Sequence, residues 1–358
     1  MIELQLRRDD IRRQQTIEKL PTPLVDDAVR LRIELFSLTS NNVTYAAMGE
    51  GILGYWDFFP AADGWGRPPC WGFATVEASN VPALAIGARF WGYFPVGTHL
   101  DVVPTQVNGH GFTDGAVHRQ AKAPVYNRYF ATAADASYVA DREAEQTLFR
   151  PLYATGWWAA DCIARGASVP RTAILSSASS KTALSTAHQL GRLGDTIIVG
   201  LTSAKNRDYV QSTSLYDSTV AYDEIGELSV EGPAVFVDYL GRRKVTSAIH
   251  RRLGATLVRS LTIGITDWTA MAKGIGDGEP LEGVTPEFFF VPDYMAGRVR
   301  EEGPALNARM VDDMRVFYPV SNALVRPVVA RGIQAVEASW RQLTGGEVPP
   351  DIGLVHGW

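Results

Sequence analysis

The stretch that decides the fold is ILSSASSKTALSTAHQL, which spans residues 174–190. A short apolar run leads into a polar group, after which an amphipathic helix is predicted over residues 181–193. The polar group comprises Ser177, Ser179, Ser180, Lys181 and Thr182. At a strand-to-helix junction, backbone N–H groups and the helix dipole attract an anion. Serine and threonine are also ordinary helix caps, but one cap would satisfy the helix, so the sequence favours a phosphate site.

Strands and helices alternate around this stretch. The predicted strands are residues 171–177, 196–201, 218–222, 234–239 and 255–265, and the predicted helices are residues 181–193, 206–215 and 245–253. Strands that alternate with helices of about a dozen residues are typical of a parallel sheet with right-handed crossovers. We therefore predict an α/β domain of the doubly wound, dinucleotide-binding type at residues 135–280.

In the first part of the chain, apolar side chains recur with a shorter period. Residues 29–37 (VRLRIELFS) alternate between charged and apolar side chains, as in a strand with one wet face. Further short strands are predicted at residues 72–77, 89–94 and 99–103, separated by turn residues, so a small antiparallel barrel or sandwich is expected. The remaining expected elements are a helical region at residues 143–165 broken at Pro151 and Gly156, a strand at 286–291, and helices at 303–315 and 325–343.

Length and composition restrict the class of protein. The chain has 358 residues, a net charge of −5, 46% hydrophobic residues and 20% charged residues, which is the profile of a folded protein with two domains. A mildly acidic chain has no broad attraction to nucleic acid or anionic lipid. Its first residues (MIELQLRRDDIRRQQ) are charged where a signal peptide is apolar, and no run approaches eighteen apolar residues. The sequence predicts a cytoplasmic protein without nucleic-acid or membrane partners.

The end of the second predicted strand carries hydroxyl groups and cations. Thr202, Ser203, Lys205 and Arg207 follow one another there, and the segment contains no carboxylate until residue 208. In a dinucleotide fold this position contacts the adenosine ribose, and an acidic side chain would bind the 2′-hydroxyl of NAD. Cations suit a 2′-phosphate instead, so the sequence favours NADP(H). A solvated basic turn is the alternative interpretation.

The motifs of common hydrolases and nucleoside triphosphatases are absent from this stretch. A Walker phosphate loop needs glycines where Leu175 and Ser180 stand. The Ser-x-x-Lys motif of penicillin-recognising enzymes needs serine where Ala178 stands. The sequence therefore gives no support for hydrolysis.

Taken in order, these segments resemble the medium-chain dehydrogenase/reductase superfamily, on its zinc-free quinone and enoyl reductase side. The resembling segments are ILSSASSKTALSTAHQL, VRLRIELFSLTSNNVTY, PALAIGARFWGYFP, PLYATGWWAADCI and FVDYLG. The segments NNVTYAAMGE, SSASSKTA and GLTSAKN more closely resemble a divergent bacterial family of unassigned function within this superfamily. The resemblance implies a Rossmann domain with a GroES-like barrel domain, a homodimer, and cofactor contact at Tyr239 in FVDYLG.

The chain also departs from that superfamily. Ala178, Lys181 and Leu184 stand where its three fingerprint glycines are expected, and the first two are expected to crowd the pyrophosphate. The catalytic zinc ligands and the four-cysteine lobe have no equivalents, since the chain has only two cysteines, Cys70 and Cys162. No metal is predicted. Polarisation of a carbonyl must then come from a hydroxyl, an amide or a histidine.

The candidate catalytic residues lie in the first part of the chain. Asn42 and Tyr45 follow the first long strand, and a tyrosine hydroxyl there could protonate or hold a substrate oxygen. A turn is the alternative for the asparagines. Tyr55 stands where the resembling proteins carry a catalytic or lid tyrosine, although YWDFFP is also typical of packing. His118 is a natural proton donor near neutral pH, against a merely structural role.

Together these observations predict an α/β protein with a GroES-like barrel domain made from residues 1–134 and 281–358 and a Rossmann domain at residues 135–280. The predicted activity is NADPH-dependent reduction of an activated carbonyl or a conjugated double bond, of enone, quinone or enoyl type, in a cleft between the domains. Two alternatives remain open: a catalytically silent NADP(H)-binding sensor or partner protein, and a lyase or isomerase on the same scaffold.

Overall fold

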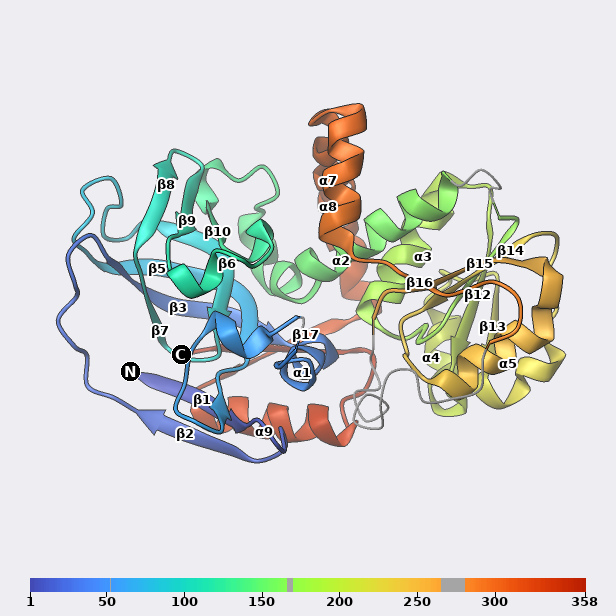
Figure 1. Ribbon diagram of the computed structural model, residues 1–358, viewed down its shortest axis with the longest axis horizontal. Helices are drawn as coiled ribbons and strands as arrows, with labels where there is room; N and C mark the ends of the chain where they lie inside the picture. Colours follow the sequence, from blue (N-terminus) through green and yellow to red (C-terminus); the bar gives the residue numbers. More distant parts are fainter. Residues whose placement is uncertain (52, 166–169, 265–280) are drawn as a thin grey trace. The chain divides into compact units, whose positions relative to one another are not determined.

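The computed structural model describes residues 1–51, 53–165, 170–264 and 281–358. The chain divides into two compact units (Figure 1). Unit 1 comprises Met1–Leu148 and Val325–Trp358, and unit 2 comprises Phe149–Leu324. The sequence predicted the second domain at residues 135–280, whereas unit 2 begins at Phe149 and ends at Leu324. The physical reason lies in two helices before Leu324, described below, which pack within unit 2.

Unit 2 is built on a six-stranded sheet in the order β13-β12-β11-β14-β15-β16. Every neighbouring pair in this sheet is parallel, as the sequence predicted. The strands are β11 (Thr172–Leu175), β12 (Ile197–Thr202), β13 (Ser218–Ala221), β14 (Ala234–Asp238), β15 (Leu257–Thr262) and β16 (Glu287–Phe288). The predicted end of the fifth strand, Ile265, lies outside the described residues.

Helices cover both faces of this sheet (Figure 1). Alternate residues of β11 point to opposite faces, so Leu175 joins a core with Ala183 and Ala187 of α3 (Lys181–Leu193). Ile174 joins the other core, with Val245 and Ile249 of α5 (Arg243–Leu253). A short helix, α4 (Arg207–Ser212), follows β12. This is the doubly wound arrangement that the alternating pattern predicted.

The helix α2 (Glu143–Ala164) is continuous over 22 residues, so the predicted breaks at Pro151 and Gly156 are wrong. The Thr155 hydroxyl donates a hydrogen bond to the Pro151 carbonyl, 3.0 Å away, inside the helix. A Cβ atom on Gly156 would lie 2.7 Å from the Cβ atom of Ser185 in α3. The glycine therefore permits close packing of α2 on α3 rather than a turn.

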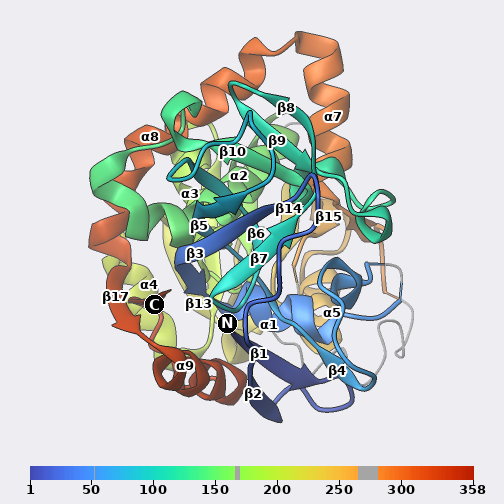
Figure 2. The ribbon, with the colours of Figure 1, turned by 90° about the vertical axis from the view of Figure 1, so that its left-hand side faces the viewer.

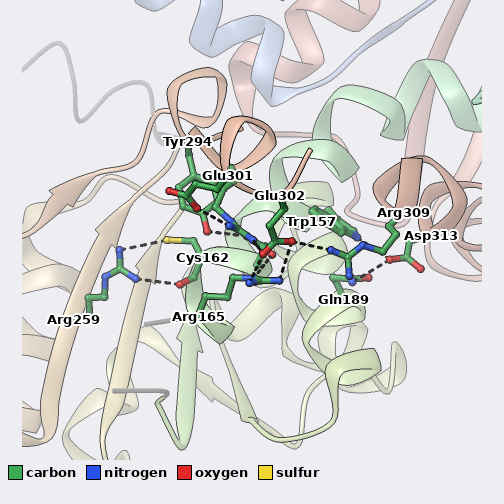
Figure 3. A network of polar contacts seen from close by, with 12 residues as sticks. Trp157, Cys162, Arg165, Gln189, Arg259, Tyr294, Glu301, Glu302, Arg309 and Asp313 are labelled. Carbon is green, nitrogen blue, oxygen red and sulfur yellow. Dashed lines mark hydrogen bonds and ion pairs between the residues drawn. The ribbon is translucent and has the colours of Figure 1, made fainter. Parts of the chain in front are cut away.

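A helical hairpin made of α7 (Val291–Glu302) and α8 (Ala305–Leu324) completes unit 2. Arg298 of α7 is buried, and its guanidinium donates to Asp161 of α2 at 2.9 Å and to Glu302 at 2.7 Å. Tyr294 donates its hydroxyl proton to the same Asp161 carboxylate at 2.8 Å. Figure 3 shows the surrounding polar network, which extends to Arg309 and Asp313. These contacts hold the hairpin to α2 and explain why unit 2 ends at Leu324.

Unit 1 contains a nine-stranded sheet in the order β17-β18-β3-β5-β6-β10-β9-β8, with β7 also paired to β3 (Figure 2). Its strands are β3 (Val29–Leu38), β5 (Pro69–Ser79), β6 (Arg89–Pro95), β7 (His99–Val102), β8 (Pro104–Asn108), β9 (Gly111–Asp114), β10 (Arg128–Ala131), β17 (Arg326–Arg331) and β18 (Ile352–Gly357). A second sheet has the order β2-β1-β4, from Gln14–Glu18, Ile2–Arg7 and Trp65–Gly66. Because β18 pairs antiparallel with β3, both ends of the chain build one sheet.

The chain after α8 differs from the sequence prediction of a helix over residues 325–343. It forms β17 and then α9 (Ile333–Gly345). The β-branched pair Val328 and Val329 extends along β18, and Gly332, with φ of +83°, turns the chain into α9. Pairing with a distant strand therefore prevails over a helical pattern.

Candidate functional site

The junction between β11 and α3 forms as the sequence predicted. Ser180 is the N-cap of α3, and its hydroxyl oxygen accepts the Ala183 N–H at 3.3 Å. Lys181 is the first residue of the helix. The first N–H groups of the helix thus emerge at the carboxyl edge of the sheet, where an anion is stabilised.

The loop before α3 is held by side chains from its neighbours. Ser177 has a left-handed backbone, with φ of +49°, and its N–H donates to the Tyr222 hydroxyl at 2.9 Å. The Tyr216 hydroxyl donates to the Ala178 carbonyl at 2.7 Å, and Asn206 donates to the Ser179 hydroxyl at 3.1 Å. These contacts fix a loop that lacks the expected glycines.

Two residues at the fingerprint positions pack inward. Ala178 is fully buried, and a Cβ atom on Gly200 of β12 would lie 3.0 Å from its methyl group. The methyl group therefore faces the sheet, and the expected crowding of a pyrophosphate by Ala178 is wrong. Leu184 is fully buried as well. Lys181 is half-buried at the helix start.

A buried pair that sequence reasoning missed ties β11 to β14. The Ser176 hydroxyl donates to Asp238 at 2.7 Å and accepts the Tyr239 N–H at 2.8 Å. The same carboxylate accepts the N–H groups of Leu240 and Gly241 and the Thr246 hydroxyl. The only sequence signal was an aspartate at the end of an apolar strand. These bonds position the loop at the point where the strand order reverses.

Tyr239 does not present its side chain to this edge. It is 1% exposed, and its hydroxyl lies 2.5 Å from the Thr186 hydroxyl of α3. The phenol packs α3 against the sheet, and the predicted cofactor contact at Tyr239 stays a prediction. Only its backbone lies beside Ser176.

The end of β12 holds the predicted cations. Thr202 is buried, Ser203 is half-buried and Lys205 is exposed. Arg207 forms an ion pair with Glu224, from the short helix Tyr222–Glu227 after β13. A carboxylate is thus present, contrary to the sequence prediction, because Thr202 and Ala221 are paired in register at the ends of parallel strands. Arg207 and Glu224 lie on different elements, so no local sequence pattern indicated this contact.

In unit 1, tyrosines gather in an aromatic cluster. Tyr45 lies in α1 (Ser40–Ala47) and packs against Tyr55, with ring centroids 4.5 Å apart and ring planes tilted by 40°. The Trp71 indole donates to the Tyr45 hydroxyl at 3.3 Å, and the hydroxyls of Tyr55 and Tyr126 lie 3.4 Å apart. The sequence predicted Tyr45 and Tyr55 as candidate catalytic residues, whereas Tyr126 was not among the candidates.

Burial controls the protonation of this cluster. Loss of solvent raises the pKa of the Tyr45 phenol well above its usual value, and the nearby Tyr55 adds to this, while hydrogen bonds from Trp71 and Asn41 act in the opposite direction. Burial likewise raises the pKa of Tyr55. Both phenols therefore keep their protons at neutral pH and can donate hydrogen bonds.

Asn42 and His118 do not join the two phenols. Asn42 caps α1: its oxygen accepts the Thr39 N–H at 2.7 Å, and its amide donates to the Pro69 carbonyl at 2.9 Å. The predicted turn is wrong, because Asn42 lies in the helix and its side chain takes part in the cap, and the predicted catalytic role of Asn42 stays a prediction. His118 is exposed and reaches the backbone carbonyl of Phe58 at 3.3 Å. No hydrogen bond links its ring to a phenol among the described residues.

Residues 1–51, 53–165, 170–264 and 281–358 contain no group of three or more histidine, cysteine, aspartate or glutamate side chains that could hold a metal ion. Within the same part of the chain, no helix is long and apolar enough to cross a membrane.

The family follows from the sequence match. Residues 36–349 match the family described as "Protein of unknown function (DUF2855)". The chain belongs to the DUF2855 family. No curated protein matches it.

Solved structures share the fold of this DUF2855 chain at low sequence identity. CurA from Vibrio vulnificus in complex with NADPH is 13% identical, with a TM-score of 0.63 over 100% of this chain and 99% of that one. The yhdH oxidoreductase from Salmonella enterica in complex with NADP is 14% identical, with a TM-score of 0.57 over 100% of both chains. A mutant form of enoyl thioester reductase from Candida tropicalis is 12% identical, with a TM-score of 0.58 over 100% of this chain and 99% of that one. The predicted two-domain α/β fold, with a strand-rich domain and a Rossmann-like parallel sheet, is confirmed.

Proposed function

We propose that this protein is an NADP(H)-dependent oxidoreductase that reduces an activated carbonyl or a conjugated C=C bond of enone, quinone or enoyl type. The observation that carries the proposal is the fixed loop and helix start at the carboxyl ends of β11 and β14. From β11 the strand order runs one way through β12 and the other way through β14, and ligands of such sheets bind where the order reverses. Similarity in fold to an oxidoreductase solved with NADP and to CurA solved with NADPH supports the choice of cofactor.

The residues at this edge fit a dinucleotide diphosphate. Ser177 and Ala178 already donate their backbone N–H groups, to Tyr222 and Leu201. A diphosphate would therefore bind further along, at the first turn of α3, with Lys181 and Thr182 beside it. A cation at a helix N-terminus is disfavoured by the dipole, and a bound anion would reverse that effect. When bound, NADPH supplies the hydride for the reduction.

In our proposal, Tyr45 stabilises the negative charge that develops on the substrate oxygen, or protonates it. Trp71 donates to the Tyr45 oxygen, and the raised pKa keeps the phenol protonated. Such a phenol is a hydrogen-bond donor to a developing oxyanion. Tyr55 supports Tyr45 by packing against its ring. The reaction proceeds in this account without a metal.

We also propose a homodimer formed through the Rossmann sheet. The strand β16 ends that sheet, and Phe288 on it is 64% exposed. The backbone groups on the outer side of an edge strand can pair with a second chain. Light scattering on the purified protein tests this: a mass of two chains supports it, and a mass of one chain contradicts it.

Two measurements test the proposed activity. Purified protein is titrated with NADPH and NADH by fluorescence, and NADPH consumption is then followed with a panel of enones, quinones and aldehydes. Turnover with any member supports the reductase. Tight binding without turnover favours a sensor or partner protein, and absence of nucleotide binding favours a cofactor-free lyase or isomerase.

A further inference from the structure

The ion pair between Arg207 and Glu224 lies at the end of β12, where a dinucleotide fold contacts the adenosine ribose. Arg207 begins α4 after β12, and Glu224 follows β13, the next strand of the sheet. Since Thr202 and Ala221 are paired in register, the segments that follow them leave the sheet side by side. Arg207 therefore has two candidate partners at one place: the carboxylate of its own chain and the phosphate of a ligand.

The pair is accessible enough to exchange. The Arg207 side chain is 31% exposed and the Glu224 side chain is 39% exposed, so both groups are in contact with water. Ion pairs of this kind contribute about 0–1 kcal/mol, because solvent screens them. A phosphate dianion offers a guanidinium a stronger, bidentate contact. Glu224 thus competes with a phosphate without excluding it.

The carboxylate has a fixed position of its own. One Glu224 oxygen lies 3.4 Å from the Ala221 nitrogen at the start of the helix Tyr222–Glu227, and the Tyr222 hydroxyl accepts the N–H of Ser177, in the loop before α3. Glu224 therefore belongs to the short helix, Tyr222–Glu227, that contacts the loop before α3. An acceptor at this place is also what a ribose 2′-hydroxyl requires.

We propose that Glu224 sets the choice between the two nicotinamide nucleotides. It competes with the 2′-phosphate of NADP(H) for Arg207, and it accepts a hydrogen bond from the 2′-hydroxyl of NAD(H). The protein then binds both nucleotides, with a smaller preference for NADPH than Lys205 and Arg207 would give alone. This inference rests on the proposed function, because it assumes that a nicotinamide nucleotide binds here.

The test compares Glu224→Gln with Asp223→Asn. The glutamine retains an oxygen for the Ala221 N–H, and Asp223→Asn makes the same change of charge at the adjacent, exposed residue. Each variant is titrated with NADPH and NADH, and with the fragments 2′,5′-ADP and 5′-ADP. We expect Glu224→Gln to bind NADPH and 2′,5′-ADP about 3- to 10-fold more tightly and NADH no more tightly, beyond any change in Asp223→Asn.

A third variant shows whether Glu224 acts through Arg207. In an Arg207→Ala background, the gain for NADPH on Glu224→Gln should vanish. If the unmodified protein binds NADPH and Glu224→Gln matches Asp223→Asn, the inference is overturned and the proposed function stands. If the unmodified protein binds none of the four ligands, both are overturned. Melting curves establish that each variant is folded.

Discussion

Tyr45 lies in a setting that suits a proton donor. Its ring is nearly covered by Tyr55 and Tyr93, its oxygen accepts the Trp71 N–H, and burial raises its pKa. Arg207 lies in the opposite setting, half-exposed and paired with an acidic side chain. Tyr45 is buried, whereas Arg207 is in contact with solvent, and each setting leads to a separate prediction.

Tyr45→Phe should lower turnover by about 10²-fold, because it removes the donor to the developing oxyanion and little packing volume. NADPH affinity should be nearly unchanged, since Tyr45 lies in unit 1 and the predicted nucleotide contacts lie in unit 2. Steady-state kinetics and a binding titration measure the two effects separately. Tyr294→Phe, which removes a hydroxyl within unit 2, is the control and should retain turnover. Equal losses in both variants would remove Tyr45 from the mechanism.

Replacing Lys205 and Arg207 together by alanine should weaken NADPH far more than NADH. A charge-assisted hydrogen bond contributes about 1.5–3 kcal/mol, so the loss for NADPH should lie between about tenfold and several hundredfold. Titration with both nucleotides measures it. Equal weakening of the two would mean that these cations do not contact a 2′-phosphate.

At the scale of the element, α3 could be predicted from the sequence to the residue. Ser180 caps its start, its apolar face is periodic, and Gly194, with φ of +89°, ends it. These signals are local. The strand β17, which sequence reasoning missed, depends on a distant partner, because it forms by pairing with β18. Pairings across the fold override local pattern.

The same division applies to the candidate site. The loop, Lys181 and the cations after β12 could be predicted because a strand-to-helix junction has a sequence signature. Glu224 and Tyr222 could not, since each contacts Arg207 or the loop before α3 from another element. Tyr239 illustrates the converse: its place at a strand end was visible, but the direction of its side chain was not.

The start of α3 leads to a prediction for Lys181→Ala. If this lysine contacts cofactor phosphate, the variant should weaken NADPH and NADH alike by about tenfold, because both contain the diphosphate. Nucleotide titration measures this, and Lys244→Ala, an exposed lysine of α5, is the control. Unchanged affinity for both nucleotides would place the phosphate elsewhere.

Asp238→Ala should destabilise unit 2, because it leaves buried donors from Ser176, Leu240 and Thr246 without their acceptor. The expected loss is about 3 kcal/mol of unfolding free energy. Thermal unfolding should show a lower melting temperature. Asp223→Ala, at an exposed site, should leave the melting temperature unchanged, and a similar fall in both variants would contradict the structural role of Asp238.

For the whole molecule, acid stability depends on a buried histidine. His356 is 1% exposed, neither ring nitrogen has a hydrogen-bond partner among the described residues, and burial lowers its pKa to about 4. The unfolded chain, with a histidine pKa of about 6.5, then binds more protons than the folded chain between these values. Stability should therefore fall as the pH decreases from about 6.5 to 4. His356→Gln should flatten this fall in melting temperature, and His110→Gln, at an exposed site, should not. An identical pH profile in both would exclude His356 as the cause.

The central claim for the whole molecule is that this DUF2855 chain is an NADP(H)-dependent protein in which the Rossmann sheet binds the nucleotide. Calorimetric titration of the unmodified protein with NADPH, and separately with NADH, tests it most directly. We predict saturable binding of one NADPH per chain, tighter than that of NADH. Absence of saturable binding of either nucleotide would contradict the account.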